Sequence, residues 1–172
     1  MIWHEIVKYS PKNYDDNGVY IKDEWSSRSD IGAVYDGKPF TLEEYLDVEQ
    51  RYVNVVLSIM RATNCKYMTI QYLEADKDYI AKQIKASKYR EIDYHLLMSI
   101  SLLEEGRRIS IERMSDILRL ALREYIYVEL FNKEHGVFVK FGYDYYLNVA
   151  CSLSNEELEH IARKESLFLD PR

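Results

Sequence analysis

Glycine-rich phosphate-binding loops are missing from this sequence, which has only six glycines in 172 residues. Neither a G-x-G-x-x-G segment nor a P-loop occurs, and such loops hold the phosphates of a nucleotide on backbone N–H groups. The G-x-S-x-G nucleophile motif and the reactive-cysteine signatures are absent as well. We therefore expect a protein that is not an enzyme and that needs no cofactor.

Cysteine and histidine are also scarce. The two cysteines, Cys65 and Cys151, lie far apart in apolar surroundings, where a thiol usually packs as a small hydrophobic group. No two histidines have the i, i+4 spacing of a zinc-binding helix and no Cys-x-x-Cys occurs, so no metal site is expected. One alternative function is a hydrolase whose active-site residues are distant in sequence. It requires a histidine beside a Ser or Cys in a cleft. The histidines are His4, His95, His135 and His160.

Long apolar segments are missing too. No window approaches 18 uncharged apolar residues, the length that a membrane-spanning helix needs. The opening residues, MIWHEIVKYSPK, lack the basic region and long apolar run of a secretory signal. We expect a cytoplasmic protein that makes no membrane contact, with residues 1–172 forming a single domain.

Positive charge is scarce in the first third of the chain. Residues 1–50 contain 11 Asp and Glu against 5 Lys and Arg, whereas residues 51–172 contain 18 of each sign, so the whole net charge of −6 arises in the N-terminal segment. Nucleic-acid binders need a Lys and Arg surface to neutralise phosphates. The sequence therefore disfavours direct nucleic-acid binding and predicts a basic partner for the acidic segment.

The pattern of apolar residues in the first half of the chain predicts alternating strands and helices. Strands are expected at residues 1–9 and 19–22, with a strand fragment at 32–35. Thr41 and Glu44 form a capping box that predicts a helix to about residue 63. A strand at residues 65–74 and a short helix capped by Asp76 follow.

The second half is expected to contain two further helices and a hairpin. Residues 91–105 fit a helix capped by Asp93 and ended by Gly106, which we favour, or a buried strand. A hairpin at residues 136–151 is followed by a helix at 155–164, whose start is indicated by a second capping box of Ser154 and Glu157. A helical stripe before the hairpin comprises Met114, Ile117, Leu118, Ala121, Leu122, Tyr125 and Val128. The fold class is α+β, a small and mainly antiparallel sheet packed with four to five helices.

The hairpin segment VKFGYDYYLNV has four aromatic rings, those of Phe141, Tyr143, Tyr145 and Tyr146. In a regular strand Phe141, Tyr143 and Tyr145 would share one face. Base stacking is disfavoured, because Lys140 is the only cation in the segment and Asp144 offsets it. Two interpretations stay open: the rings belong to the core, or the tyrosines at the turn contact a partner.

Two blocks of the sequence, residues 18–53 and 118–149, cover about two-fifths of the chain. The first has the Ser-Asp-Ile-Gly loop before a Leu-Glu-Glu-Tyr helix, and the second has Leu-Arg-Glu before the hairpin Phe-Gly-Tyr-Asp-Tyr-Tyr. Together they resemble bacterial immunity proteins of contact-dependent growth inhibition and related polymorphic toxin systems. The resemblance implies a small cytoplasmic inhibitor that binds a delivered toxin domain, commonly a nuclease, and blocks it.

The candidate partner-binding surface combines the loop region at residues 13–37 with the tip of the hairpin. Its members are Asp23, Glu24, Trp25, Asp30, Asp36, Tyr143 and Asp144. Loops positioned by a scaffold often perform recognition, and a tryptophan is a common interface anchor. Pairing of Glu24 or Asp30 with Arg28 or Arg123 would make these acids structural. The alternative function is a regulatory domain that binds a small molecule or peptide in a pocket lined by the aromatic hairpin.

Overall fold

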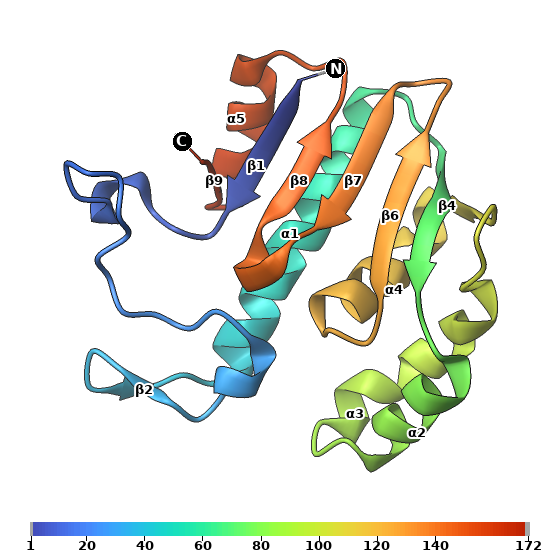
Figure 1. The fold of residues 1–172 in the computed structure, drawn as a ribbon, viewed down its shortest axis with the longest axis horizontal. Helices are drawn as coiled ribbons and strands as arrows, with labels where there is room; N and C mark the ends of the chain where they lie inside the picture. Colours follow the sequence, from blue (N-terminus) through green and yellow to red (C-terminus); the bar gives the residue numbers. More distant parts are fainter. Residues whose placement is uncertain (1, 171–172) are drawn as a thin grey trace.

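The computed structural model describes residues 2–170, in which seven strands form one antiparallel sheet (Figure 1). The strand order is β5-β4-β6-β7-β8-β1-β9, and all neighbouring pairs are antiparallel. The strands are β1 (Trp3–Val7), β4 (Tyr67–Glu74), β5 (Arg108–Ser110), β6 (Tyr127–Asn132), β7 (Val137–Phe141), β8 (Leu147–Ala150) and β9 (Phe168–Leu169). A separate small hairpin pairs β2 (Val34–Tyr35) with β3 (Lys38–Pro39).

The helices are of two kinds. The α-helices are α1 (Leu42–Ala62), α2 (Lys77–Ala86), α3 (Arg90–Asp93), α4 (Ile111–Leu122) and α5 (Asn155–Lys164). The 3₁₀ helices are η1 (Pro11–Asn13), η2 (Arg28–Asp30), η3 (Tyr94–Leu102) and η4 (Tyr143–Tyr145). In Figure 1, α1, α4 and α5 lie behind the sheet, and the face toward the viewer has no helix on it.

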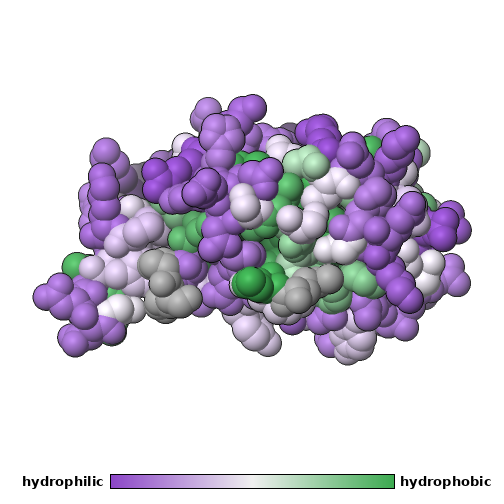
Figure 2. Space-filling model, turned by 90° about the horizontal axis from the view of Figure 1, so that it is seen from above, coloured by the Kyte–Doolittle hydropathy of each residue, from purple (hydrophilic) through white to green (hydrophobic). Residues whose placement is uncertain are grey.

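Side chains of the central strands alternate between the core and the open face. In β6, Val128 and Leu130 are buried, whereas Tyr127 and Glu129 stay partly exposed. This period of two is what a sheet covered on one face requires. Seen from above, the molecule is mostly hydrophilic at its edges, and hydrophobic side chains gather toward the middle (Figure 2).

The α+β class and the mainly antiparallel sheet are confirmed. Local signals located the first and last helices well. The Thr41 side chain accepts from the Glu44 backbone N–H at the start of α1, and Ser154 accepts in the same way from Glu157 at the start of α5. Asp76 caps α2 as expected, accepting from the Tyr79 backbone N–H. All three side chains accept hydrogen bonds from backbone N–H groups that the start of a helix leaves unpaired.

The helix expected to continue through Val128 ends earlier. Glu124 takes the left-handed conformation with φ 61°, and the Tyr125 N–H donates back to the Leu120 carbonyl at 2.9 Å. This is the geometry of a helix stop. The chain then reverses, and residues from Tyr127 onward form β6, so Tyr125 and Val128 do not belong to the helical stripe.

Two further predictions are corrected. Residues 94–102 form a 3₁₀ helix instead of an α-helix, and Asp93 does not cap it because its carboxylate is bound to buried arginines. Residues 19–22 form no strand; the segment makes a single bridge between Tyr14 and Tyr20. The short strands β5 and β9 have no counterpart in the sequence prediction.

The hairpin tip also differs from a regular strand. Asp144 has φ 54° and Tyr145 has φ 63°, both in the left-handed region. The resulting turn separates rings that strand geometry would place together. Tyr145 is buried with Phe141, whereas Tyr143 is 93% exposed.

Candidate partner-binding surface

The loop between β1 and α1 forms a hollow that brings four of the predicted residues together. Its volume is about 490 Å³. Asp23, Glu24, Trp25 and Asp36 line it from the loop side. Five carboxylates and three cations line this N-terminal hollow: Asp23, Glu24, Asp36, Glu44 and Asp47, with Lys22, Lys38 and Arg51. Negative charge is therefore in excess on a concave surface.

Asp23 and Asp36 are the exposed carboxylates of the prediction that line the hollow. Both are exposed, and neither forms a salt bridge within residues 2–170. Asp36 and Gly37 make the two-residue turn of the β2–β3 hairpin, with φ 50° and 75°. An Asp-Gly pair suits this turn, because both central residues need positive φ. The turn thus holds the Asp36 carboxylate at the rim.

Glu24 is partly occupied by internal contacts. Its carboxylate accepts from Lys8 Nζ at 3.1 Å and also from the Tyr20 hydroxyl. Lys8 lies over the rings of Tyr9 and Trp25, at 4.1 and 4.4 Å from their centroids. Burial lowers the pKa of Lys8, and the adjacent Glu24 charge opposes that shift. Glu24 therefore supports the loop as well as lining the hollow.

Asp30 stabilises the loop and does not line the hollow. Its carboxylate accepts from the backbone N–H groups of Ser26 and Ser27 at 2.9 and 3.0 Å. With Ser27 it forms the capping box of η2. Because the Asp30 carboxylate has this structural use, the acidic residue of the Ser-Asp-Ile-Gly segment is explained without contact to a partner protein.

Trp25 is not the exposed anchor that the sequence suggested. Its side chain is 9% exposed and stacks on Phe40, with centroids 4.5 Å apart and planes inclined by 15°. It also meets Tyr145 edge-on at 5.2 Å. Trp25 therefore packs the loop between β1 and α1 against the core and against the hairpin tip.

The hairpin tip places Tyr143 and Asp144 at the surface, outside the N-terminal hollow. The Tyr9 hydroxyl donates to the Asp144 carbonyl at 2.8 Å, which joins the tip to the end of β1. Tyr145 points inward and donates to the Tyr45 hydroxyl at 2.7 Å. The tip thus has one ring in the core and another, Tyr143, directed away from it.

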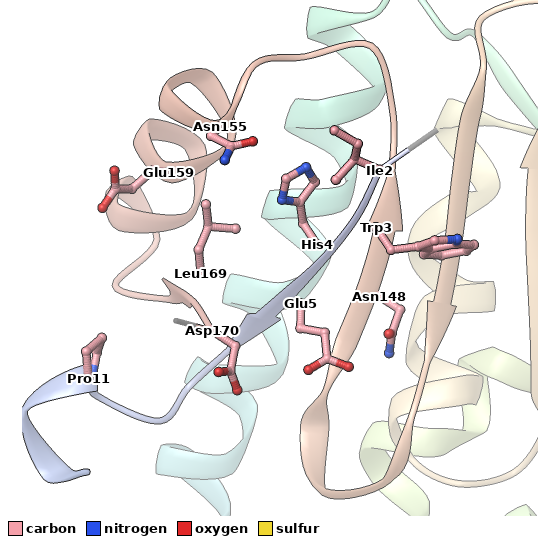
Figure 3. A pocket seen from close by; sticks show the side chains of 10 residues that line it. All are labelled: Ile2, Trp3, His4, Glu5, Pro11, Asn148, Asn155, Glu159, Leu169 and Asp170. Carbon is pink, nitrogen blue, oxygen red and sulfur yellow. The ribbon is translucent and has the colours of Figure 1, made fainter. Parts of the chain in front are cut away.

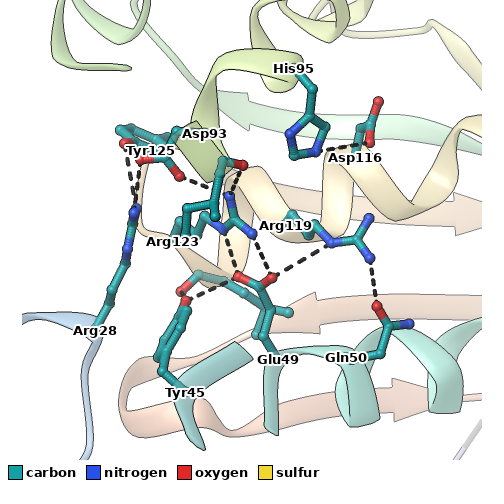
Figure 4. Close-up of polar contacts among 12 residues, drawn as sticks. Arg28, Tyr45, Glu49, Gln50, Asp93, His95, Asp116, Arg119, Arg123 and Tyr125 are labelled. Atoms are coloured by element: carbon teal, nitrogen blue, oxygen red, sulfur yellow. Dashed lines mark hydrogen bonds and ion pairs between the residues drawn. The ribbon is translucent and has the colours of Figure 1, made fainter. Parts of the chain in front are cut away.

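Buried charges near the loop form a network that sequence reasoning did not assign (Figure 4). Arg28 Nη2 lies 2.8 Å from Asp93, and Arg123 Nη1 lies 2.8 Å from the other oxygen of Asp93. Arg123 also binds Glu49. Arg28 and Arg123 thus pair with Asp93 and Glu49 instead of Glu24 or Asp30. The network ties η2 to α1, α3 and the end of α4.

One signal in the sequence could have revealed Glu49. It lies four residues after Tyr45 and three before Tyr52, both fully buried on α1. A carboxylate on the buried stripe of a helix requires an internal cation. Asp93 had no such local signal, because Arg28 and Arg123 are distant in sequence.

A larger cleft of about 850 Å³ lies beside β1 (Figure 3). His4 lines it together with Glu5, Glu159 and Asp170. The described residues that line it include no Ser or Cys, so this cleft lacks the nucleophile that the dispersed hydrolase requires. Among residues 2–170 no group of three or more His, Cys, Asp or Glu is placed to hold a metal ion.

Comparisons with family models, with curated proteins and with solved structures gave no match to this chain. None of the helices in residues 2–170 combines the length and apolar character needed to cross a membrane.

Proposed function

We propose that this chain is a cytoplasmic immunity protein that neutralises a cognate toxin domain by stoichiometric binding. The expected toxin is a nuclease with a basic surface. The observation that carries the proposal is the N-terminal hollow, where Asp23 and Asp36 are exposed without a cationic partner within residues 2–170. The sequence resemblance agrees with it.

Charge is the first physical argument. A nuclease needs cationic groups to bind the phosphates of its substrate. Carboxylates held on a concave surface can occupy the same groups and so exclude the substrate. They also speed the encounter of the two proteins, because long-range attraction orients the partners before contact.

Rigidity is the second argument. The loop that presents Asp23 and Asp36 is held by Trp25 in the core, by the bond from Lys8 to Glu24, and by Arg28 in the buried network. A surface ordered before binding loses less conformational entropy on association. The irregular loop is therefore suited to tight binding despite having little regular secondary structure.

The alternative, a regulatory domain with an aromatic pocket, has one observation in its favour. Tyr143 and Phe141 of the hairpin line a second groove, together with Tyr72 and Tyr127. That groove is bordered by a 93% exposed ring, whereas small-molecule sites usually enclose most of their ligand. The open groove fits a contact for part of a larger partner better.

The proposal is tested by titration of enzyme activity. The domain encoded immediately upstream of this chain is purified, and its nuclease activity is measured against increasing amounts of the chain. We expect activity to fall linearly to zero near one equivalent. Undiminished toxin activity at a tenfold excess of the chain, with no complex by gel filtration, would contradict the proposed function.

A further inference from the structure

The strands β6 and β7 separate at one end and leave a groove between them. Their pairing runs from Glu129 and Lys140 to Asn132 and Val137. Beyond Glu129, β6 continues toward α4 while β7 leads into the turn η4, and Figure 1 shows the two strands diverging there. The opening, called here the β6–β7 groove, has a volume of about 670 Å³.

The lining of the β6–β7 groove combines an apolar part with tyrosines and glutamates. The apolar members are Ala121, Ile126, Val128 and Phe141. The polar side chains are Tyr72, Tyr127, Tyr143, Glu74, Glu124 and Glu129. No Lys or Arg is among the described residues that line it. The groove therefore has a single sign of charge, unlike the N-terminal hollow.

Hydrogen bonds from tyrosines orient two of these glutamates. The Tyr72 hydroxyl donates to Glu74 Oε1 at 2.8 Å, and the Tyr127 hydroxyl donates to Glu129 Oε1 at 2.9 Å. Partial burial and the bond to Glu129 raise the pKa of Tyr127 to about 12. The tyrosines thus stay neutral donors at pH 7, and the charge of the glutamates remains available to a ligand.

One neighbouring cation offsets part of the charge of the groove. Lys140 Nζ forms a long ion pair with Glu129 Oε1 at 3.9 Å and lies 5.3 Å from the Trp3 ring centroid. Glu124 accepts from the Ser27 hydroxyl at 3.4 Å, a neutral contact. A cationic ligand would find Glu74 and Glu124 without a salt bridge in residues 2–170, and Glu129 paired only at 3.9 Å.

Tyr143 provides a ring whose exposure is built into the turn. The left-handed Asp144 and Tyr145 direct Tyr145 inward, where its hydroxyl contacts Tyr45 and the Leu122 carbonyl. Tyr143 is thereby left at the rim of the groove, 93% exposed. An exposed aromatic ring beside carboxylates is a favourable site for a cation.

We propose that the β6–β7 groove receives an arginine side chain of a partner protein. The aliphatic stem of arginine can lie along the rings of Tyr72 and Tyr143, which are 44% and 93% exposed, as long cationic side chains do on apolar surface. Its planar guanidinium can pair with the glutamates and stack on tyrosine, which the compact ammonium of lysine does less well. This inference rests on the proposed function for the identity of the partner, which is then the toxin.

The test uses a probe that needs no knowledge of the toxin. Isotope-labelled protein is titrated with the peptide acetyl-Gly-Arg-Gly-amide, and with the same peptide carrying neutral citrulline, while backbone amide shifts are followed by NMR. We expect shifts concentrated at Val128, Glu129, Gly142 and Tyr143. The citrulline peptide should bind at least about tenfold more weakly, because it lacks charge-assisted hydrogen bonds.

Two matched double variants separate a built site from general attraction. Glu74→Gln with Glu129→Gln should weaken binding of the arginine peptide about tenfold. Asp78→Asn with Glu91→Gln removes the same charge from exposed positions on α2 and α3. This second variant should change the affinity for the arginine peptide by less than about twofold. Equal binding of the citrulline peptide, or shifts spread evenly over the acidic surface, would overturn the inference.

The same variants distinguish failure of this inference from failure of the proposed function. If the arginine peptide binds in the groove but the upstream toxin domain does not bind the protein, the proposed function is wrong and the arginine subsite stands. If the Glu74→Gln and Glu129→Gln variant neutralises the toxin as tightly as the unaltered protein, the arginine subsite is wrong and the proposed function stands.

Discussion

Arg123 and Glu49 form a two-point ion pair inside the protein. Nε and Nη2 of Arg123 each lie 2.7 Å from a carboxylate oxygen of Glu49, and both side chains are 2% exposed. The remaining nitrogen, Nη1, binds Asp93, which in turn binds Arg28 of the acidic loop. The buried charges of Arg123, Glu49 and Asp93 thus hold the loop of the candidate surface in position through Arg28.

Replacing Glu49 with Gln should destabilise the protein strongly. The change leaves the Arg123 guanidinium buried with one carboxylate less, and breaking a buried pair from one side costs about 3 to 5 kcal/mol. Urea denaturation followed by circular dichroism measures the loss. Glu43→Gln, at an exposed position of the same helix, is the control and should change stability by about 0.5 kcal/mol or less. Equal stability of the two variants would show that the network contributes nothing.

Acid should weaken the same network through Asp93. Burial alone would raise the pKa of this carboxyl group, but hydrogen bonds from Arg28, Tyr125 and Ser87 outweigh burial and lower it below its ordinary value of 3.8. The folded protein then holds Asp93 ionised while the unfolded chain takes up a proton. The stabilisation is complete above pH 3.8 and should be lost as the pH falls from there through the lowered pKa of the folded protein, by at most about 1.4 kcal/mol for each pH unit.

The measurement for Asp93 is the free energy of unfolding between pH 5 and pH 2, compared with that of Asp93→Asn. The variant is less stable at neutral pH, and its curve should be flatter below pH 3.8 because this proton is no longer taken up on unfolding. Parallel curves for the two proteins would refute the assignment of the acid sensitivity to Asp93.

Alkali should destabilise the fold through its buried tyrosines. Burial raises the pKa of Tyr45, Tyr52 and Tyr145 above the ordinary value of 10.0. Since the unfolded chain ionises first, their stabilising effect is complete below pH 10.0 and declines above it, by about 1.4 kcal/mol per pH unit for each tyrosine. Tyr52→Phe should make that decline shallower by about 1.4 kcal/mol per pH unit. A decline as steep as that of the unaltered protein would contradict the burial of Tyr52.

The two tryptophans should respond very differently to replacement by alanine. Trp25 lies in the core, and its loss should cost about 3 to 5 kcal/mol. Trp3 is 45% exposed and meets Phe138 edge-on at 4.9 Å, so its loss should cost about 1 kcal/mol. Thermal or urea unfolding of both variants measures the difference. A small effect at Trp25 together with a large effect at Trp3 would reverse our assignment.

The parts of the fold that the sequence predicted are those with local causes. The capping boxes at Thr41 and Ser154 concern residues three apart, and they defined the starts of α1 and α5. Alternation predicted β4 and the β7–β8 hairpin for the same reason. The end of α4 was missed because the residue that takes the left-handed conformation there is Glu124. A glycine is the usual sequence signal for such a helix end.

The candidate site was predicted less well, because its geometry depends on distant contacts. Exposure of Asp23 and Asp36 agreed with the expectation from loop chemistry. Trp25 was misplaced, since the stacking of its ring on Phe40 and Tyr145 has no sequence signature. A pocket lined by the aromatic hairpin was considered as an alternative, but the place and the acidic lining of the β6–β7 groove were not foreseen. They depend on the early end of α4 and the turn at Tyr143, neither of which periodicity reveals.

The most direct test of the central claim is the association rate with the upstream toxin domain, measured by stopped flow at several salt concentrations. Asp23→Asn with Asp36→Asn alters the N-terminal hollow, while Asp78→Asn with Glu91→Gln removes the same charge at α2 and α3, far from β2 in Figure 1. We predict an association rate about tenfold lower at low salt, with a weaker salt dependence, for the first variant alone. Identical rates and salt dependence for both variants and the unaltered protein would contradict docking of the toxin at the N-terminal hollow.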